Sequence, residues 1–573
     1  MPPSNSRLRQ TRLGPRLVSA YRPCQQPNHA RFPSDGTLEF VLTTRERAVK
    51  DFASGKILGT HAEDKMRSRS QIVIAVRFFM LALSFFCVDA NAQTRVTIGV
   101  TETIETANPY GDSVSLLYGI WSEVTGPFCT YNFSKGDFEG RLAERWKVEN
   151  PTTWVFYLNK NYKFNDGSPV TTEDVVHSMM NRVINDPQSK QKASVAGPVI
   201  KAEAIDRFTV KFITDKPAAP LLGFLCDRLI ITSKAAFDKY GRDGADKEHM
   251  MGGGPYRLKE IIPGQRLVIA KRTDHPEAKK NPRAPDEIVY RVMRETEQRV
   301  TALLNDEIQI AQFIPPHLRQ RVEKSPNLRV TSVDSVEIMF LAMQPKPPFD
   351  KKEVRQAVCH AINRDQIINT VLEGFASRLD GPIGPGQYGY DPNLQPKLNY
   401  DPEKSKKLLV QAGFPNGVDV ELQTPVGRYT LDKQLAEAMV PMLNAAGFRA
   451  KLLTPEWPTL WANVQKGTIP FYYMGRGSVQ DPSAALHQYF YTGETPRIGY
   501  SNPRFDELLD KEQEEFNPKK RREYLVKAMS LLTDDAPACF LWRHKLLWGL
   551  NNRVDYKPLP DARIFGMDMK IRQ

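Results

Sequence analysis

The chain has 573 residues, more than one hydrophobic core usually supports, so we expect two or three domains. Apolar residues make up 41% of it and charged residues 25%, which is typical of a folded globular protein. Of the net charge of +13, about half lies in residues 1–92, which hold 14 Lys or Arg and 7 Asp or Glu. The rest is mildly basic and has no basic run interleaved with aromatic residues, so composition argues against nucleic-acid binding.

Residues 66–92 have the pattern of a cleavable export signal. Arg67 and Arg69 precede a stretch at 72–88 that is apolar apart from one arginine and one serine, and Ala-Asn-Ala at 90–92 fits a cleavage site. The apolar run after the arginine is far shorter than the roughly 20 residues of a permanent membrane-spanning helix. We therefore expect the protein to be exported and this segment to be removed.

Residues 1–65 come before the export signal, although such a signal has to stand near the start of a chain to work. They are rich in Arg, Pro and Ser and show no sustained hydrophobic periodicity. Two explanations are open: translation starts at Met66 and the earlier residues come from a misplaced start, or they form a disordered leader. In either case, residues 1–92 are left out of the expected fold.

The first half of the remaining chain predicts strands and helices separated by turn-forming residues. Strands are expected where β-branched and aromatic residues cluster, and helices where apolar residues recur at helical spacing. In chain order, the expected elements are a strand at 95–100, a helix at 113–124, a strand at 154–158, a helix at 175–183 that is capped by residues 171–174, and strands at 209–213 and 266–271.

The second half, from about Val336, predicts a regular alternation of helices and strands. The expected elements are helices at 354–361, 364–372 and 402–412, a strand at 418–424, a helix at 431–446, and strands at 449–453 and 471–474. This β-α-β rhythm predicts an α/β domain in which helices cover a sheet.

The cysteines and histidines predict no metal centre or cofactor. None of the six cysteines forms a CxxC pair, and the nine histidines show no metal-ligand spacing. Cys359 is followed by His360, but neighbouring residues of a helix point to different sides, so we interpret Cys359 as a partly buried apolar side chain rather than a nucleophile. Four cysteines follow Ala92, so zero to two disulfides are expected after export.

Seven segments together resemble one protein family. In chain order they are GRLAERW (140–146), KFNDGSPVTTEDV (163–175), GGPY (253–256), RVTALLN (299–305), PFD to VRQAVCHAINRD (348–365), YDPEKSKKLL to GFPNG (400–417) and YSNP (500–503). In this order they resemble the peptide/nickel/opine-type solute-binding proteins of ABC importers, which are the bacterial extracellular solute-binding proteins of family 5. The resemblance covers nearly all of residues 93–560.

The resemblance implies an α/β, two-lobed, periplasmic-binding-protein-like fold of type II, with an extra subdomain inserted in the first lobe. Residues 93–335 would form lobe 1, residues 336–545 lobe 2, and residues 546–573 a return to lobe 1. It further implies a monomer in the periplasm that encloses a small-molecule or peptide-like solute by hinge closure. The protein would then deliver that solute to ABC permease subunits and their ATPase, without catalysis.

One departure from the family bears on the solute. Peptide-binding relatives carry the segment Trp-x-Gly-Asp-x-x-Asp-Pro, whose first Asp pairs with the ammonium group of a peptide. Aligning Asp481 with the second Asp of that segment places Gly477 at its Gly and Ser478 at the ammonium-binding Asp. A neutral hydroxyl cannot act as a counter-ion, and burying an unpaired ammonium group raises the free energy of the complex by roughly several kcal/mol. Arg476 reverses the local charge: it favours a carboxylate or phosphate if it faces the cleft, and is uninformative if it faces solvent.

Four more residues are candidate contacts because they lie in loops where the resemblance implies solute binding. Arg428 and Tyr429 follow the strand expected at 418–424, and Asn108 and Tyr110 follow the first strand. Together with the departure at Ser478, they favour an acylated or modified peptide, an opine-like compound or another organic anion over a free dipeptide.

The sequence offers less support for two other functions. An exported hydrolase would need a nucleophile elbow, an HExxH segment or paired catalytic carboxylates, and the serine of the Gly475–Val479 segment is misplaced for GxSxG. A receptor that serves signalling or chaperoning rather than import remains open.

Overall fold

The computed structural model describes residues 94–102, 104–111, 115–477 and 481–572, all of them within one compact unit, Ala92–Gln573. The expected export signal and the residues before it lie outside the described residues. Within the described ranges, no helix combines the length and the apolarity that crossing a membrane requires.

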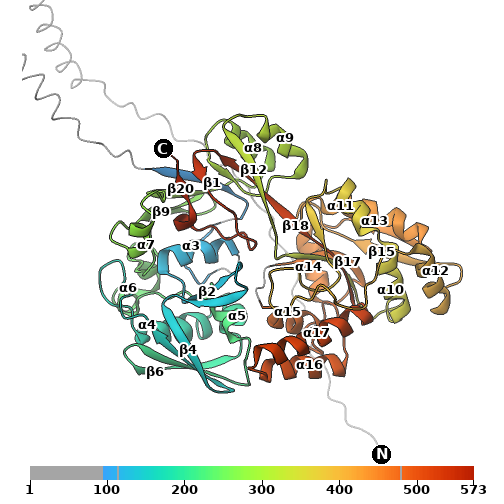
Figure 1. Cartoon of the computed structure of the whole chain (residues 1–573), viewed down its shortest axis with the longest axis horizontal. Helices are drawn as coiled ribbons and strands as arrows, with labels where there is room; N and C mark the ends of the chain where they lie inside the picture. The colour runs from blue at the N-terminus through green and yellow to red at the C-terminus, as the bar shows by residue number, and fades with distance from the viewer. Residues whose placement is uncertain (1–93, 103, 112–114, 478–480, 573) are drawn as a thin grey trace, which may run out of the picture. The chain divides into compact units, whose positions relative to one another are not determined.

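A mixed sheet of twelve strands runs through this unit (Figure 1). Its strands follow the order β16-β15-β17-β13-β18-β11-β1-β10-β9-β8, and β12 and β14 pair with β18 beside this path. The bounds are β1 Arg95–Val100, β8 Tyr256–Ile262, β9 Arg266–Lys271, β10 Glu287–Val292, β11 Ile310–Ala311, β12 Leu328–Asp334, β13 Ile338–Met343, β14 Ala376–Arg378, β15 Val418–Gln423, β16 Phe448–Leu453, β17 Phe471–Arg476 and β18 Ala538–Asn551.

The 14-residue strand β18 is shared by two hydrophobic cores. Its first residues pair with β13 and β14, and its last residues pair with β12 and β11. Trp542 lies in one core, whereas Trp548 lies in the other, which also holds Trp121. We call the half around Trp121 and Trp548 the first lobe and the half around Trp542 the second lobe. The expected two-lobed α/β fold is confirmed.

The chain crosses between the lobes a second time, from β12 to β13, alongside β18. At the crossing the Ser335 amide donates a hydrogen bond to the His544 carbonyl over 2.8 Å. The Asp334 carboxylate accepts hydrogen bonds from Ser377 at 2.7 Å and from Arg543 at 3.3 Å. Two neighbouring strands that connect two packed lobes form the kind of narrow joint at which hinge motion occurs. The limits expected near residues 336 and 546 lie beside this crossing, and we retain them as proposed lobe limits.

In the first lobe the chain leaves the large sheet after β1 and returns to it at β8. In between it forms a four-stranded antiparallel sheet of order β4-β5-β7-β6, in which the rings of Phe156 and Phe212 pack 5.2 Å apart. The bounds are β2 Cys129–Asn132, β3 Asp137–Gly140, β4 Ala143–Asn150, β5 Thr153–Leu158, β6 Val199–Asp206, β7 Thr209–Thr214, α3 Ser115–Thr125, α4 Thr172–Val176, the π-helices η1 His177–Ile184 and η2 Lys192–Ala196, α5 Leu221–Leu225, α6 Lys234–Asp246 and α7 Pro276–Lys280. A smaller cluster beside this lobe holds α8 Thr296–Leu304, η3 Pro316–Leu318 and α9 Arg319–Glu323.

The second lobe packs helices against β13, β15, β16 and β17. The bounds are α10 Lys352–Ala361, α11 Arg364–Thr370, α12 Pro402–Gln411, α13 Asp432–Ala445, α14 Trp457–Gln465, α15 Ser483–Phe490, α16 Pro503–Glu514 and α17 Pro518–Asp535. The chain then follows β18 back to the first lobe and ends with β19 Val554–Asp555, η4 Gly566–Asp568 and β20 Lys570–Ile571. Figure 1 shows the helices of this lobe on the right and those of the first lobe on the left.

One disulfide closes part of the first lobe. Cys129 on β2 is bonded to Cys226, which directly follows α5, and the bond closes a loop with a sequence separation of 97 residues. Cys359 and Cys539 are free thiols buried in the second lobe. The disulfide therefore fixes the first lobe and leaves the second lobe without a crosslink among the described residues.

Replacing both Cys129 and Cys226 with serine is expected to lower the free energy of unfolding by about 2–4 kcal/mol, because a long loop of the unfolded chain is no longer closed. Urea unfolding of the exported protein, followed by circular dichroism, measures this. Reductant should destabilise the parent protein to a similar extent and leave the double variant unchanged. A reductant effect on the double variant would contradict the assignment of Cys359 and Cys539 as thiols.

Candidate functional site

The two lobes touch along the edge formed by α5 in the first lobe and α15 and α16 in the second (Figure 1). The Ala219 amide donates a hydrogen bond to the Gln513 carbonyl over 2.8 Å. The Tyr131 hydroxyl donates to the Gly386 carbonyl over 3.2 Å. Gly223 lies so close to the second lobe that a β-carbon placed on it would stand 2.9 Å from the β-carbon of Asp481. The structure thus has the lobes in contact.

Arg476 ends β17 in the second lobe, and its side chain is buried, with 6% of its surface exposed. Its guanidinium carbon lies 5.1 Å from the ring centre of Tyr489 on α15. Among the described residues it has no hydrogen-bond or ion-pair partner. Burial lowers the pKa of Arg476 to about 10, the Tyr489 hydroxyl opposes this change, and the positive charge of Arg228 adds to it. The sequence left open whether this side chain faces the cleft or solvent, and the structure has it buried.

Arg228 belongs to the first lobe, just after α5, and its positive charge contributes to lowering the pKa of Arg476 in the second lobe. Its guanidinium donates to the Ser194 carbonyl over 3.3 Å. Burial lowers the pKa of Arg228, and the nearby charge of Arg563 contributes to the same change. Two positive side chains, one from each lobe, therefore disfavour each other's charge.

A second group of charges joins both lobes and the crossing strands. Glu102 follows β1, Glu337 lies between β12 and β13, and Arg428 follows β15. Burial raises the pKa of Glu102 and of Glu337, and the Arg428 guanidinium counteracts this in both cases. The Thr101 hydroxyl donates to the Glu102 carboxylate over 3.0 Å. These side chains come from three separate segments, so a change in the angle between the lobes alters how they meet.

The loop that carries Arg428 and Tyr429 is held by one carboxylate. Asp432, the first residue of α13, accepts hydrogen bonds from the amides of Gly427 (3.0 Å), Arg428 (2.9 Å) and Tyr429 (3.0 Å). The Arg428 guanidinium carbon lies 5.0 Å from the ring centre of Tyr429 and 5.3 Å from that of Trp457. Fixed amides and stacked rings thus pre-organise a loop whose arginine is exposed.

Tyr429 also connects this loop to the end of β17. Its hydroxyl donates to the Gly475 carbonyl over 3.2 Å. The structure thereby brings together four of the predicted site residues, namely Arg428, Tyr429, Arg476 and Gly477. Gly477 is exposed, with open space where a side chain would stand. Ser478, on which the departure from the peptide-binding segment depends, lies outside the described residues.

Asp481 is engaged in a buried ion-pair network. Its carboxylate accepts two hydrogen bonds from Arg521 of α17, at 2.7 and 2.8 Å, and one from the Ser483 amide at 3.0 Å. The same guanidinium donates to Glu512 of α16 over 2.9 Å. Burial raises the pKa of Glu512 to about 7; the Arg521 guanidinium opposes this change, and the negative charge of Asp481 adds to it. Asp481 thus ties α15 to α16 and α17, which does not favour it as a free counter-ion for a solute.

Asn108 and Tyr110 lie in a turn of the first lobe rather than beside the other candidates. Tyr110 has no exposed surface, and its hydroxyl donates to the Ile230 carbonyl over 3.0 Å. The Asn108 side-chain oxygen accepts a hydrogen bond from the Tyr110 amide over 2.9 Å. Both residues stabilise the turn, and this placement disfavours Tyr110 as a solute contact.

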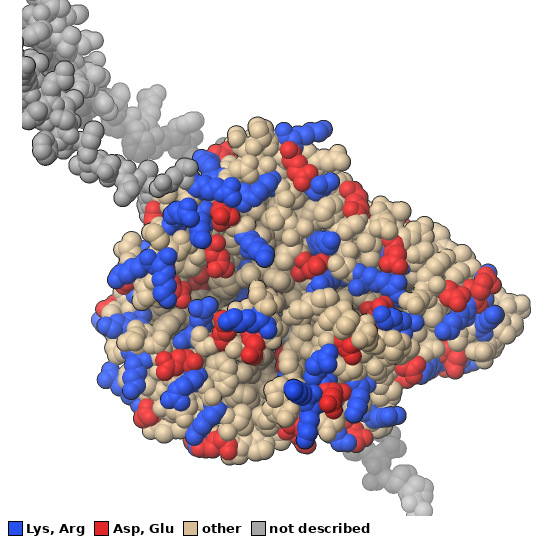
Figure 2. Space-filling model, viewed as in Figure 1, with Lys and Arg blue, Asp and Glu red and all other residues tan. Residues whose placement is uncertain are grey.

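Four residues of the cleft were not predicted from the sequence: Glu102, Arg228, Glu337 and Tyr489. None stands in a segment whose composition or spacing signals a site, and only the fold brings them together. Among the described residues, no group of three or more His, Cys, Asp and Glu side chains is arranged to hold a metal ion. On the face in Figure 2, basic and acidic side chains are interspersed and form no continuous basic surface.

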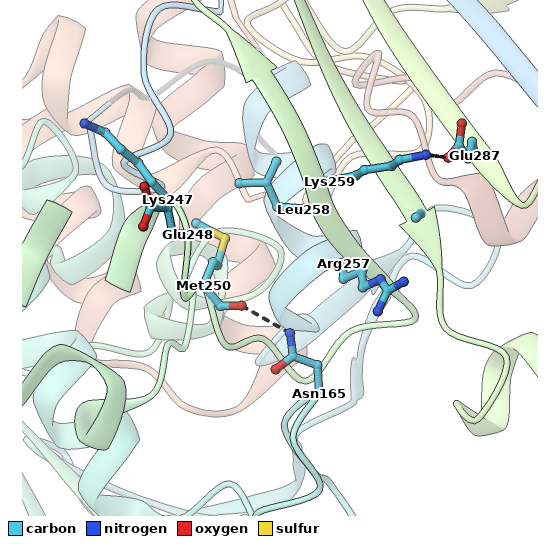
Figure 3. A pocket seen from close by; sticks show the side chains of 9 residues that line it. Asn165, Lys247, Glu248, Met250, Arg257, Leu258, Lys259 and Glu287 are labelled. Atoms are coloured by element: carbon cyan, nitrogen blue, oxygen red, sulfur yellow. Dashed lines mark hydrogen bonds and ion pairs between the residues drawn. The ribbon is translucent and has the colours of Figure 1, made fainter. Parts of the chain in front are cut away.

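A separate hollow of about 400 Å³ lies in the first lobe (Figure 3). The Asn165 side-chain amide donates to the Met250 carbonyl over 3.1 Å, and Lys259 is ion-paired with Glu287. Since its residues come from the first lobe alone and these polar groups are already paired, the cleft between the lobes is the stronger candidate.

Comparison with known proteins gives one consistent family. The family model of bacterial extracellular solute-binding proteins, family 5 (middle), matches residues 137–497. The probable D,D-dipeptide-binding periplasmic protein DdpA of Escherichia coli K12 is 26% identical over 443 residues, which cover 73% of this chain and 81% of DdpA. The glutathione-binding protein GsiB of Pectobacterium atrosepticum is 27% identical over 436 residues, which cover 74% of this chain and 83% of GsiB.

Among solved structures, the binding protein MoaA of A. tumefaciens R10 in complex with mannopinic acid superimposes with a TM-score of 0.68 at 25% identity. The superposition covers 84% of this chain and all of MoaA. The sequence resemblance and the fold similarity thus point to the same family.

Replacing Arg521 with methionine is expected to lower the free energy of unfolding by about 3–5 kcal/mol, because two buried carboxylates lose their shared cation. Replacing its exposed neighbour Arg522 with methionine on the same helix should change it by less than about 0.5 kcal/mol. Urea denaturation measures both. An Arg521→Met protein as stable as the parent would contradict the structural role given to Asp481.

Proposed function

This chain belongs to the bacterial extracellular solute-binding proteins, family 5, and on that premise we propose that it captures a peptide-like or other small organic solute between its two lobes. It is the substrate-binding component of an ABC importer. We further propose that it acts as a monomer and hands the solute to the permease subunits, which work with their ATPase.

One observation carries the proposal of a solute site between the lobes. Charged side chains from the first lobe, the second lobe and the crossing strands influence one another there, since the Arg428 charge counteracts the effect of burial on the pKa of both Glu102 and Glu337. Polar groups that converge from several segments on one cleft are typical of ligand sites. Because the groups belong to different lobes, a bound solute gains its contacts only when the lobes close, so binding shifts the equilibrium toward the closed state.

The relatives support a broad class of solute rather than one compound. Their names concern a D,D-dipeptide, glutathione and mannopinic acid. We carry over to this chain the feature common to the three, which is a small, polar organic compound rather than a macromolecule. The aspartate that binds the peptide ammonium group in the segment of peptide-binding relatives corresponds to position 478, which is a serine in this chain.

We propose binding without catalysis. Cys359 is buried against Cys539, and His360 directs its Nδ1 at the Asn399 carbonyl, 2.6 Å away. Both side chains are therefore engaged with protein groups other than each other, as expected for structural residues. The members of the family are binding proteins.

We also propose that the protein is periplasmic and that segment 66–92 directs its export. Mass spectrometry of the N-terminus of the natively exported protein is expected to find Gln93 as the first residue, because cleavage would follow the small residues at 90–92. Peptides from residues 1–65 in the exported protein would contradict both the cleavage and the misplaced start.

A thermal-shift screen of the exported protein against peptides, opines, sugars and organic acids tests the receptor function. A true solute at 100 times its Kd should stabilise the protein by about 2.7 kcal/mol, since it binds only the folded state. Failure of every compound in these classes would contradict the proposal.

The variant Gly223→Val tests closure. The added side chain would press against Asp481 in the closed arrangement, so the Kd of the solute found in the screen is expected to rise about tenfold, the equivalent of about 1.4 kcal/mol. Ala235→Val adds bulk at an exposed position of α6 in the same lobe and should leave the Kd unchanged. Equal affinities of the two variants would contradict closure at this contact.

A further inference from the structure

We propose that Arg476 of the second lobe and Arg228 of the first lobe form an anion-recognition site, and that the transported solute carries a carboxylate or another oxyanion group at this end of the cleft. The inference rests on the proposed function and adds the chemical class of the solute to it. It follows from a comparison of the partners that the buried arginines have in the described part of the chain.

Eight arginine side chains are buried among the described residues, and seven of them have carboxylate or carbonyl partners. Examples are Arg182 with Asp246 at 2.7 Å, Arg521 with Asp481 at 2.7 Å, and Arg364 with the Leu379 carbonyl at 2.8 Å. Arg476 is the eighth, and within the part of the chain that the structure describes its one side-chain partner is the ring of Tyr489. A buried guanidinium without hydrogen-bond acceptors is costly, so a missing partner of this kind points to a ligand.

The carboxylates closest in sequence to Arg476 and to Arg228, Asp481 and Asp227, already form ion pairs with other arginines. Asp481 serves Arg521, and Asp227 lies 2.8 Å from Arg563. The Arg428 charge acts on both Glu102 and Glu337, whereas Arg476 is not among the charges that act on either of them. Among the described residues, the protein therefore supplies no counter-ion to Arg476, and an oxyanion of the solute can take that place.

The position of Arg228 couples the anion to closure of the lobes. Two positive side chains that approach from opposite lobes repel each other, which raises the free energy of the closed state when the cleft holds no anion. An oxyanion between them accepts charge-assisted hydrogen bonds from both and turns repulsion into attraction. Closure then depends on the charge of the solute, so a neutral analogue of the same shape gains less from it.

The test compares matched acids and neutral analogues on the exported protein. The matched pairs are an N-acetylated dipeptide with its C-terminal amide, and gluconate or glucose 6-phosphate with glucose; free dipeptides are included as well. Binding is measured first by thermal shift and then by calorimetry. The compounds that bind are expected to be acids, with a Kd at least about tenfold lower than that of the neutral partner. The carboxylate and phosphate probes distinguish the two sources of the oxyanion.

The variant Arg476→Gln is expected to bind the preferred acid at least about tenfold more weakly and to lose the discrimination between acid and neutral analogue. Its ligand-free melting temperature should equal or exceed that of the parent, because a buried unpaired charge is removed, whereas a purely structural arginine would lower it. Arg497→Gln is the matched control, since Arg497 lies 5.5 Å from the same Tyr489 ring and stacks on Trp461 at 4.8 Å. It should retain the discrimination.

The outcomes separate the two proposals. A neutral compound bound as tightly as its acid, or an Arg476→Gln protein that still prefers the acid, would overturn the anion site and leave the receptor function intact. Binding of none of the probes or of the wider solute classes would count against the receptor function itself, and the anion site would fall with it.

Discussion

The fold depends on one strand that serves two hydrophobic cores. β18 places Trp542 in the second lobe and Trp548 in the first, only six positions further along the chain. Its neighbours β12 and β13 make the same crossing in the opposite direction. Two adjacent strands hold the lobes at a defined distance, while the rest of each lobe packs on its own core. This permits a change of angle between the lobes without unfolding either of them.

Whether a buried charged side chain has a partner of opposite charge within the protein distinguishes structural residues from candidate ligand contacts. At Asp481, Glu512 and Arg521 the charges lie within a few ångströms of one another and join three segments of the second lobe. At Arg476, by contrast, the described residues place an aromatic ring but no carboxylate beside a buried cation, and the charge of Arg228 disfavours it further. The first arrangement is complete without a ligand, whereas the second has no carboxylate partner among the described residues, and a bound anion would supply one. The contrast explains why the ion pair with Arg521 disfavours Asp481 as a solute contact.

Much of the fold could be predicted from local patterns. The strand expected at 95–100 is β1, the strand expected at 154–158 is β5 with one residue more, and the cap expected at 171–174 starts α4, where the Asp174 carboxylate accepts the Thr171 amide at 2.9 Å. β18 was not predicted, because it is buried on both faces and so lacks the alternation that marks a strand at the surface. The site was harder for a different reason: Arg476 and Arg228 lie on different lobes, and no pattern in the chain relates them. Whether Asn108, Tyr110 and Asp481 contact the solute stays a prediction, which their hydrogen bonds to protein groups disfavour.

The most direct test of a solute enclosed between hinged lobes is the distance between a spin label on each lobe, measured by pulsed electron paramagnetic resonance. Lys201 on the first lobe and Lys407 on the second are exposed positions for the labels. The solute found by screening is expected to shorten and narrow the distance distribution, while a control pair at Lys201 and Arg207 within the first lobe stays unchanged. An identical distribution between the lobes with and without bound solute would contradict capture by closure.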